Sequence, residues 1–253
     1  MFKKVLLFIL LLFSFSNAFA ASEPDVPILL YHNIAESYEA SDNLLHITPE
    51  RFKEHMQALN NAGYTAISYN DYKNYVNGVS SIPEKSIIIA FDDGYLSNYT
   101  YAFPILKEFG MKAAIFVVTG SVDNEKTVYP HFGYAQAKEM LDSGLIEIGS
   151  HTHSHRSFKE LSYEETVTEL RKSKYLIESK LKINCTLLAY PYGFENEWTK
   201  SEAIKAGYEV INLVGDKGTN RPSDGLFDLK RLTVSGHLDG EELLEMIEKN
   251  REL

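Results

Sequence analysis

The stretch Ser86-Ile-Ile-Ile-Ala-Phe-Asp-Asp-Gly94 organises this chain, because an apolar, β-branched run leads directly into two carboxylates and a glycine. The unbroken apolar residues Ile87 to Phe91 predict a strand covered on both faces, as in parallel sheets. Asp92 and Asp93 then fall where the strand stops, and successive strand side chains point to opposite sides. The pattern predicts two carboxylates with different tasks in one pocket. A polar turn after a strand is the alternative interpretation.

A second cluster, Gly149-Ser-His-Thr-His-Ser-His155, follows another apolar stretch, Leu145-Ile-Glu-Ile148. Histidines gathered at a strand end favour a metal site over solvated surface histidines. One aspartate and two histidines suit zinc, with other divalent ions possible, and three protein ligands leave a position open for water. Such a metal polarises a carbonyl and lowers the pKa of bound water, and a second carboxylate beside it can take the proton.

The composition is that of a globular protein: 253 residues, 44% hydrophobic and 12% aromatic, which suffices for a packed core. The N-terminus differs, because Lys3 and Lys4 precede an apolar run and a small-x-small site at Ala18-Phe-Ala20. This pattern predicts a secretory signal peptide over residues 1–20. We therefore expect an exported protein, extracellular, at the cell surface or periplasmic, without a stable transmembrane span after cleavage. An uncleaved anchor is the alternative.

The mature chain is expected to be acidic. Removing residues 1–20 takes away two lysines and no acid, so 25 basic against 35 acidic side chains become 23 against 35, and the formal charge changes from -10 to -12. This charge disfavours nucleic acid and anionic polymers, and neutral or cationic substrates fit better. The single Cys185 cannot form an internal disulfide and is predicted to be a small buried hydrophobic residue. The sequence gives no indication of an oligomeric state.

Predicted strands and helices alternate along residues 21–253 without an internal repeat or a low-complexity linker, which indicates one domain with a parallel sheet. Seven or eight strand and helix units are the right number for a barrel. The unusual residues each follow a predicted strand: His32, Asp92 and Asp93, His151 to His155, and Pro191-Tyr-Gly193. Barrels and open doubly wound sheets both keep their sites at this edge, so the placement does not separate the two folds.

Phe-Asp-Asp-Gly, Ser-His-Thr-His-Ser-His and Tyr-Pro-Tyr-Gly, in this order and spacing, resemble the first three motifs of the polysaccharide deacetylases, the NodB-homology or carbohydrate esterase family 4 enzymes. The resemblance covers most of the mature chain. It implies a distorted, incomplete β/α barrel of about seven strands as a catalytic domain over 21–253. It also implies Asp93, His151 and His155 as metal ligands and Asp92 as the base. His153 is then expected to face solvent or to support the site, although ligation by His151 and His153 is geometrically possible.

The third motif departs from the family's usual pattern. Ala189-Tyr190 stands where many members carry an arginine, and we expect Arg231 to orient the base instead. In the matching turn, the resemblance implies that the backbone amide of Tyr192, between Pro191 and Gly193, helps to stabilise the oxyanion.

The general acid has two candidates. Tyr31-His32 resembles the subgroup that deacetylates poly-β-1,6-N-acetylglucosamine, in which the late histidine motif has moved to the first strand. His237 has the family's usual late position, but its flanking residues match poorly. We therefore favour His32 as the acid that protonates the departing amine.

The resemblance implies a secreted, metal-dependent hydrolase that removes N-acetyl groups from poly-β-1,6-N-acetylglucosamine, peptidoglycan or a chitin-like polymer, with water bound at the metal attacking the acetamide carbonyl. The expected metal is Zn2+, with Co2+, Mn2+, Fe2+ or Ni2+ as alternatives. The alternative function is an O-acetyl esterase acting on xylan or a peptidoglycan deacetylase, and the remote one is a non-catalytic glycan-binding protein. Four aromatic residues near the predicted rim are candidates for a sugar platform or, alternatively, core packing: Tyr95, Tyr129, Tyr192 and Trp198.

Overall fold

The computed structural model describes residues 23–124, 126–214 and 218–251. The predicted signal peptide, residues 1–20, lies outside this part of the chain. Within it, no helix combines the length and the apolar character that crossing a bilayer requires.

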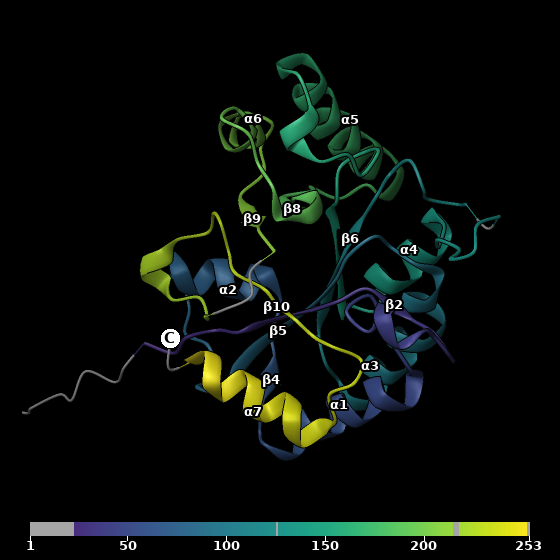
Figure 1. The fold of residues 1–253 in the computed structure, drawn as a ribbon. Helices are drawn as coiled ribbons and strands as arrows, with labels where there is room; N and C mark the ends of the chain where they lie inside the picture. Colours follow the sequence, from purple (N-terminus) through teal and green to yellow (C-terminus); the bar gives the residue numbers. More distant parts are fainter. Residues whose placement is uncertain (1–22, 125, 215–217, 252–253) are drawn as a thin grey trace, which may run out of the picture.

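A curled, parallel sheet forms the centre of the molecule (Figure 1). Its strands run in the order β10-β1-β5-β6-β7-β8-β9, and β4 pairs with β5 beside this path. The bounds are β1 (Ile28–Tyr31), β4 (Thr65–Ala66), β5 (Ser86–Phe91), β6 (Ala113–Val117), β7 (Ile146–Ser150), β8 (Leu187–Ala189), β9 (Val210–Asn212) and β10 (Leu232–Thr233). The predicted incomplete barrel of about seven strands is confirmed. A separate pair, β2 (Asn33–Ile34) and β3 (His46–Ile47), was not predicted, because two residues are too short for a periodic pattern.

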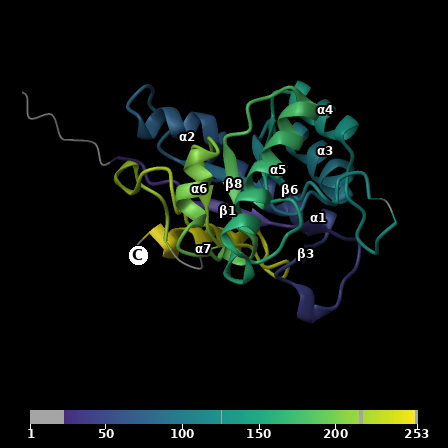
Figure 2. The same ribbon diagram turned by 90° about the horizontal axis from the view of Figure 1, so that it is seen from above.

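Helices surround the sheet, as the view from above makes clear (Figure 2). They are α1 (Pro49–Asn61), α2 (Tyr69–Val76), α3 (Phe103–Phe109), α4 (Tyr134–Asp142), α5 (Tyr163–Leu181), α6 (Thr199–Lys205) and α7 (Gly240–Arg251). Helix α1 begins where the sequence predicts, because the Thr48 side chain accepts a hydrogen bond from the Arg51 amide and Pro49 occupies the first turn. It ends before Gly63, whose φ of 79° suits a glycine.

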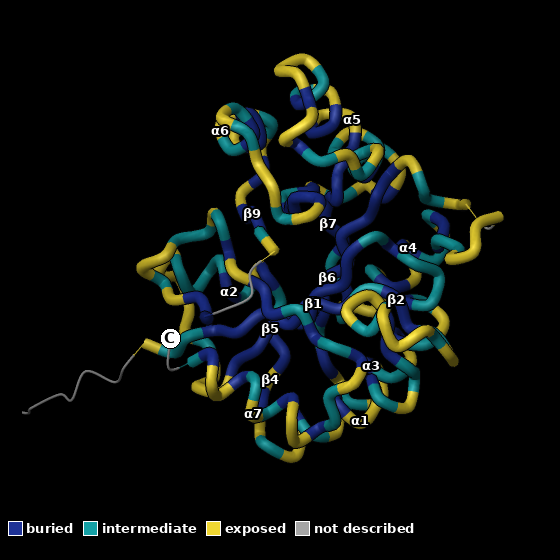
Figure 3. The backbone as a smooth tube through the Cα atoms, viewed as in Figure 1, coloured by how far each residue is buried: buried dark blue, intermediate teal, exposed yellow. Residues whose placement is uncertain are grey.

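Alternation along β5 divides its side chains between two cores, and all six residues are buried (Figure 3). Ile89 packs in the larger core, between the sheet and the helices, whereas Ile88 and Ala90 belong to a second core inside the curl. Asp92 continues the face of Ile88 and Ala90, because strand side chains repeat every two residues. The strand therefore directs this carboxylate into the interior of the half-barrel.

The two edges of the sheet come together through the segment that precedes β10. Asn212 in β9 forms a parallel bridge with Leu229, and the Leu213 amide donates to the Leu229 carbonyl. Three residues later, Leu232 pairs with Leu29 of β1. Arg231 lies between these two attachments, so the closing segment carries a guanidinium into the barrel.

Candidate active site

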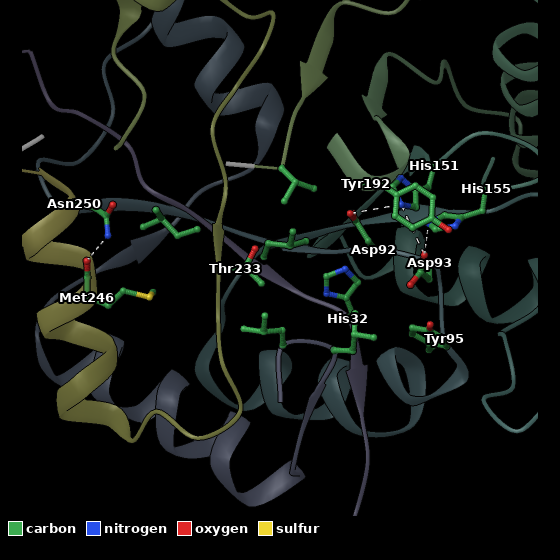
Figure 4. A pocket seen from close by; sticks show the side chains of 15 residues that line it. His32, Asp92, Asp93, Tyr95, His151, His155, Tyr192, Thr233, Met246 and Asn250 are labelled. Atoms are coloured by element: carbon green, nitrogen blue, oxygen red, sulfur yellow. Dashed lines mark hydrogen bonds and ion pairs between the residues drawn. The ribbon is translucent and has the colours of Figure 1, made fainter. Parts of the chain in front are cut away.

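The carboxyl ends of several strands surround a cavity of about 670 Å³ (Figure 4). The polar and aromatic side chains of its reactive end are His32 after β1, Asp92, Asp93 and Tyr95 after β5, His151 and His155 after β7, and Tyr192 after β8. The sequence predicted the positions of these residues at strand ends, and the curl of the sheet brings them to one place.

Asp93, His151 and His155 form a cluster suited to a metal ion. One ligand atom from each residue lies within 4.8 Å of the others. The Oδ1 atom of Asp93 is 3.3 Å from Nε2 of His155 and 3.7 Å from Nε2 of His151. Nδ1 of His151 lies 2.9 Å from the Ala189 carbonyl, which can only accept, so Nδ1 donates and Nε2 is free to ligate. This oxygen and nitrogen set fits zinc or a similar divalent cation.

The backbone of the histidine loop explains which histidines converge. Thr152 and His155 adopt positive φ values of 67° and 58°, and Asp93 has a φ of 72°. Non-glycine residues in this region are uncommon and tend to occur at functional sites. His153 lies between the two turned residues, and its Nδ1 atom is 3.0 Å from Oγ1 of Thr119, away from the cluster.

Glu169 of α5 holds this loop in place, and the sequence analysis missed it. Its Oε2 atom accepts hydrogen bonds from the amides of His153 and Ser154, both at 2.8 Å, and its Oε1 atom accepts one from the Ser154 hydroxyl at 2.7 Å. The sequence does contain a sign of this role, because Glu169 lies next to Leu170 on the buried face of α5, where a charged residue is unusual. A buried carboxylate needs partners, and here they are loop amides.

Asp92 forms a buried ion pair with Arg231. The two guanidinium nitrogens donate to the two carboxylate oxygens at 2.7 and 2.8 Å, and the side chains are 0% and 1% exposed. Arg231 also donates a hydrogen bond from Nε to the Leu213 carbonyl, and this bond fixes the orientation of its guanidinium group. Burial opposes ionisation of Asp92, but the charge and hydrogen bonds of Arg231 together with the neighbouring His151 and His32 outweigh this effect, so the pKa of this carboxyl lies well below its usual range. Asp92 is therefore an oriented, ionised carboxylate.

His32 lies beside Asp92 in the cavity (Figure 4). Its carbonyl accepts a hydrogen bond from the Asn98 amide group, whereas its buried Nδ1 atom has no hydrogen-bond partner among the described residues. Burial lowers the pKa of His32, and the charges of Asp92 and Asp93 only partly oppose this effect. The structure thus places a half-buried imidazole, whose buried Nδ1 atom is unused, at the reactive end of the cavity.

The competing histidine lies elsewhere. His237 is exposed, its ring centroid is 6.5 Å from that of Tyr38, and it does not line the cavity. Of the proposed platform aromatics, Tyr95 lines the cavity. The ring centroid of Tyr129 lies 6.1 Å from that of Tyr95. Trp198 packs against Tyr163 outside the cavity.

The third motif forms a tight turn at the cavity rim. Tyr192 has a φ of 60°, is 57% exposed, and its ring lies 4.8 Å from that of His155. Pro191 is buried beneath it. Gly193 has a φ of 70°, and a Cβ atom there would come within 2.6 Å of the Val214 amide nitrogen. Only glycine fits this position without displacing the backbone of Val214.

Comparisons with known proteins agree on one family. The family model described as polysaccharide deacetylase matches residues 80–211. The "Putative polysaccharide deacetylase YxkH" of Bacillus subtilis is 33% identical over 85% of this chain and 73% of its own length. The poly-beta-1,6-N-acetyl-D-glucosamine N-deacetylase of Escherichia coli is 27% identical over 72% of this chain and 32% of its own length. Among solved structures, the Streptococcus pyogenes deacetylase PplD in complex with acetate superposes with a TM-score of 0.80, at 25% identity over 89% of this chain and 99% of that one.

Proposed function

Because the chain belongs to the polysaccharide deacetylase family, whose members are hydrolases acting on acetamide bonds, we propose that it is an exported, metal-dependent enzyme that removes N-acetyl groups from N-acetylglucosamine units of a polysaccharide. The observation that carries this proposal is the junction of Asp92 and Asp93. One carboxylate pairs with Arg231, and the other lies among the histidine nitrogens. Export rests on the residue pattern of positions 1–20.

Neighbouring residues divide the chemistry. A divalent metal held by Asp93, His151 and His155, most suitably Zn2+, would supply Lewis-acid polarisation of the acetamide carbonyl. Asp92 accepts the proton of the attacking water, and Arg231 keeps its carboxylate ionised and aimed.

The departing nitrogen needs a proton, because an amide anion is too basic to leave unaided. We assign this donation to His32, which lines the cavity beside Asp92, and not to His237, which lies outside it. At the rim, the backbone amide of Tyr192 is the proposed donor to the developing oxyanion, and Pro191 and Gly193 fix its turn.

The proposed substrate is poly-β-1,6-N-acetylglucosamine. Support comes from the relative named for that activity and from the Tyr31-His32 pair at the end of β1. The test is mass spectrometry of β-1,6-N-acetylglucosamine, chitin and peptidoglycan oligomers after incubation with the zinc-loaded protein. Loss of acetyl mass at unchanged chain length from the β-1,6 oligomer supports the proposal. Chain shortening, or release of acetate only from O-acetylated xylan, would contradict it.

The ligand assignment has its own test, with a control in the same loop. His151→Ala and His155→Ala are expected to lose bound zinc in elemental analysis, whereas His153→Ala is expected to keep it, because that imidazole turns toward Thr119. Unchanged zinc content in both His151→Ala and His155→Ala would overturn the assignment.

A further inference from the structure

The cavity continues past the catalytic residues into a second region, which we call the apolar arm. It is lined by Leu30, Val214, Leu232, Thr233, Met246 and Asn250. In Figure 4, Thr233 lies next to His32, and Met246 and Asn250 of α7 lie farther from Asp93. Leu30 lies in β1 two residues before His32, which follows the strand, and both side chains line the cavity, so the arm begins beside the imidazole.

The surface of the apolar arm is suited to hydrocarbon. None of its six side chains is charged. The amide of Asn250 is already occupied, because its Nδ2 donates to the Met246 carbonyl and its Oδ1 accepts from the Gly218 amide, both at 2.9 Å. Among the described residues that line the arm, a polar ligand would therefore find few free partners, whereas an alkyl chain would lose contact with water at no hydrogen-bond cost to these residues.

The cavity as a whole is larger than an acetyl group requires. The whole cavity measures about 670 Å³, which falls within the range of roughly 300–1,000 Å³ typical of sites for drug-sized ligands. An acetyl group contributes a single methyl beyond the reacting carbon. Its seat next to Asp92 and His32 would leave the stretch from Leu232 to Met246 unfilled.

The geometry also fixes which part of a substrate can enter the arm. A glycan chain continues on both sides of the reacting unit and must stay at the open rim, where Tyr192 is exposed. The alkyl group is the only carbon branch of the amide carbonyl, and it is not connected to the chain except through that carbonyl. With the glycan at the rim, this group can extend past Asp92 and His32 toward Leu30, which lines the same cavity.

We propose that the apolar arm binds the alkyl part of acyl groups longer than acetyl, so that the enzyme also hydrolyses glucosamine units carrying short- or medium-chain N-acyl groups. This inference rests on the proposed function. In the step, the amide C–N bond breaks and a C–O bond to water forms. The acyl group leaves as a carboxylate, and the nitrogen gains both protons of the water and leaves as an ammonium group.

The experiment compares hydrolysis of glucosamine oligomers carrying acetyl, propionyl, butyryl or hexanoyl groups by the zinc-loaded protein. Each added methylene that is buried is expected to raise kcat/KM about fourfold, the equivalent of ~0.8 kcal/mol. Hexanoate is expected to inhibit acetyl removal at least tenfold more strongly than acetate, because the product occupies the same arm. This inhibition is measured on the unaltered protein and does not depend on any variant folding.

Two substitutions narrow the arm from different elements: Val214→Trp at the end of β9 and Met246→Trp on α7. Each is expected to lower kcat/KM for butyryl and hexanoyl groups at least tenfold and to change the acetyl value less than twofold. Leu244→Trp on the same helix is the matched control, since Leu244 does not line the cavity, and it is expected to leave the whole series unchanged.

The outcomes separate the two proposals. The acyl inference is overturned, and the proposed function stands, if two results occur together. The protein removes acetyl groups but hydrolyses butyryl and hexanoyl groups more than tenfold more slowly, and acetate and hexanoate inhibit it equally. Absence of hydrolysis for every oligomer overturns both. A chain-length preference that survives both Val214→Trp and Met246→Trp also overturns the inference, because the alkyl group would then lie elsewhere.

Discussion

Replacing Arg231 by methionine is expected to destabilise the fold strongly, because it removes the partner of a buried charge. In the structure, both carboxylate oxygens of Asp92 accept hydrogen bonds from Arg231, and both side chains are shielded from water. Removing one member of such a pair typically costs about 3–5 kcal/mol. The exposed pair of Arg156 and Glu165, also 2.8 Å apart, supplies the control, because Arg156→Met should cost about 0–1 kcal/mol.

The pH dependence follows from the pKa of Asp92. In the native protein this pKa lies below its ordinary value, so the pair stabilises the fold above pH ~4 and the stabilisation is lost as the pH falls. Without Arg231, burial is expected to raise the pKa of Asp92. The folded variant is then more stable with Asp92 protonated than with Asp92 ionised. The stability deficit of Arg231→Met should therefore be larger at pH 7 than at pH 4.

The assay is urea unfolding followed by circular dichroism, with a chelator present so that metal binding does not contribute. A double variant, Arg231→Met with Asp92→Asn, removes both charges and is expected to recover part of the loss, because no buried charge is left unpaired. A deficit below about 1 kcal/mol at pH 7, or one of equal size at pH 4, would refute the reasoning.

Three further predictions concern single residues. Asp92→Asn should keep bound zinc but lose about a hundredfold to ten-thousandfold in kcat, because a carboxamide cannot accept the proton; near-normal turnover would exclude the base role. His32→Ala should hydrolyse an activated ester almost normally and the acetamide hardly at all. If His237→Ala shows this selective loss of acetamide hydrolysis and His32→Ala does not, His237 is the general acid. Burial raises the pKa of Cys185 from 9.0 to about 12, so the folded thiol stays protonated while the unfolded one ionises. Unfolding free energy should therefore fall between pH 9.0 and about 12, by about 1.4 kcal/mol per pH unit from this thiol, and Cys185→Ala should show a shallower slope.

The sequence by itself determined the elements and the placement of the chemistry along them. The apolar run of β5 predicts a fully buried strand, and Thr48-Pro49 and Gly63 mark the ends of α1 because capping acts within one turn. The same short-range geometry places Asp92, Asp93 and the histidine cluster at strand ends. These features are readable because residues close in the chain constrain one another directly.

The tertiary structure alone decided how distant residues meet. Arg231 reaches Asp92 across 139 positions, and the sequence offered it only as a substitute for a missing arginine. His155 joins the metal cluster and His153 does not, because Glu169 of α5 binds the loop amides of His153 and Ser154. The extent of the apolar arm depends on the packing of α7 on α1, which brings Met246 and Asn250 to the cavity that β10 also lines, and no local pattern encodes this packing. Such contacts follow from the closure of the sheet and the packing of its helices, so they exist only once the whole chain has folded.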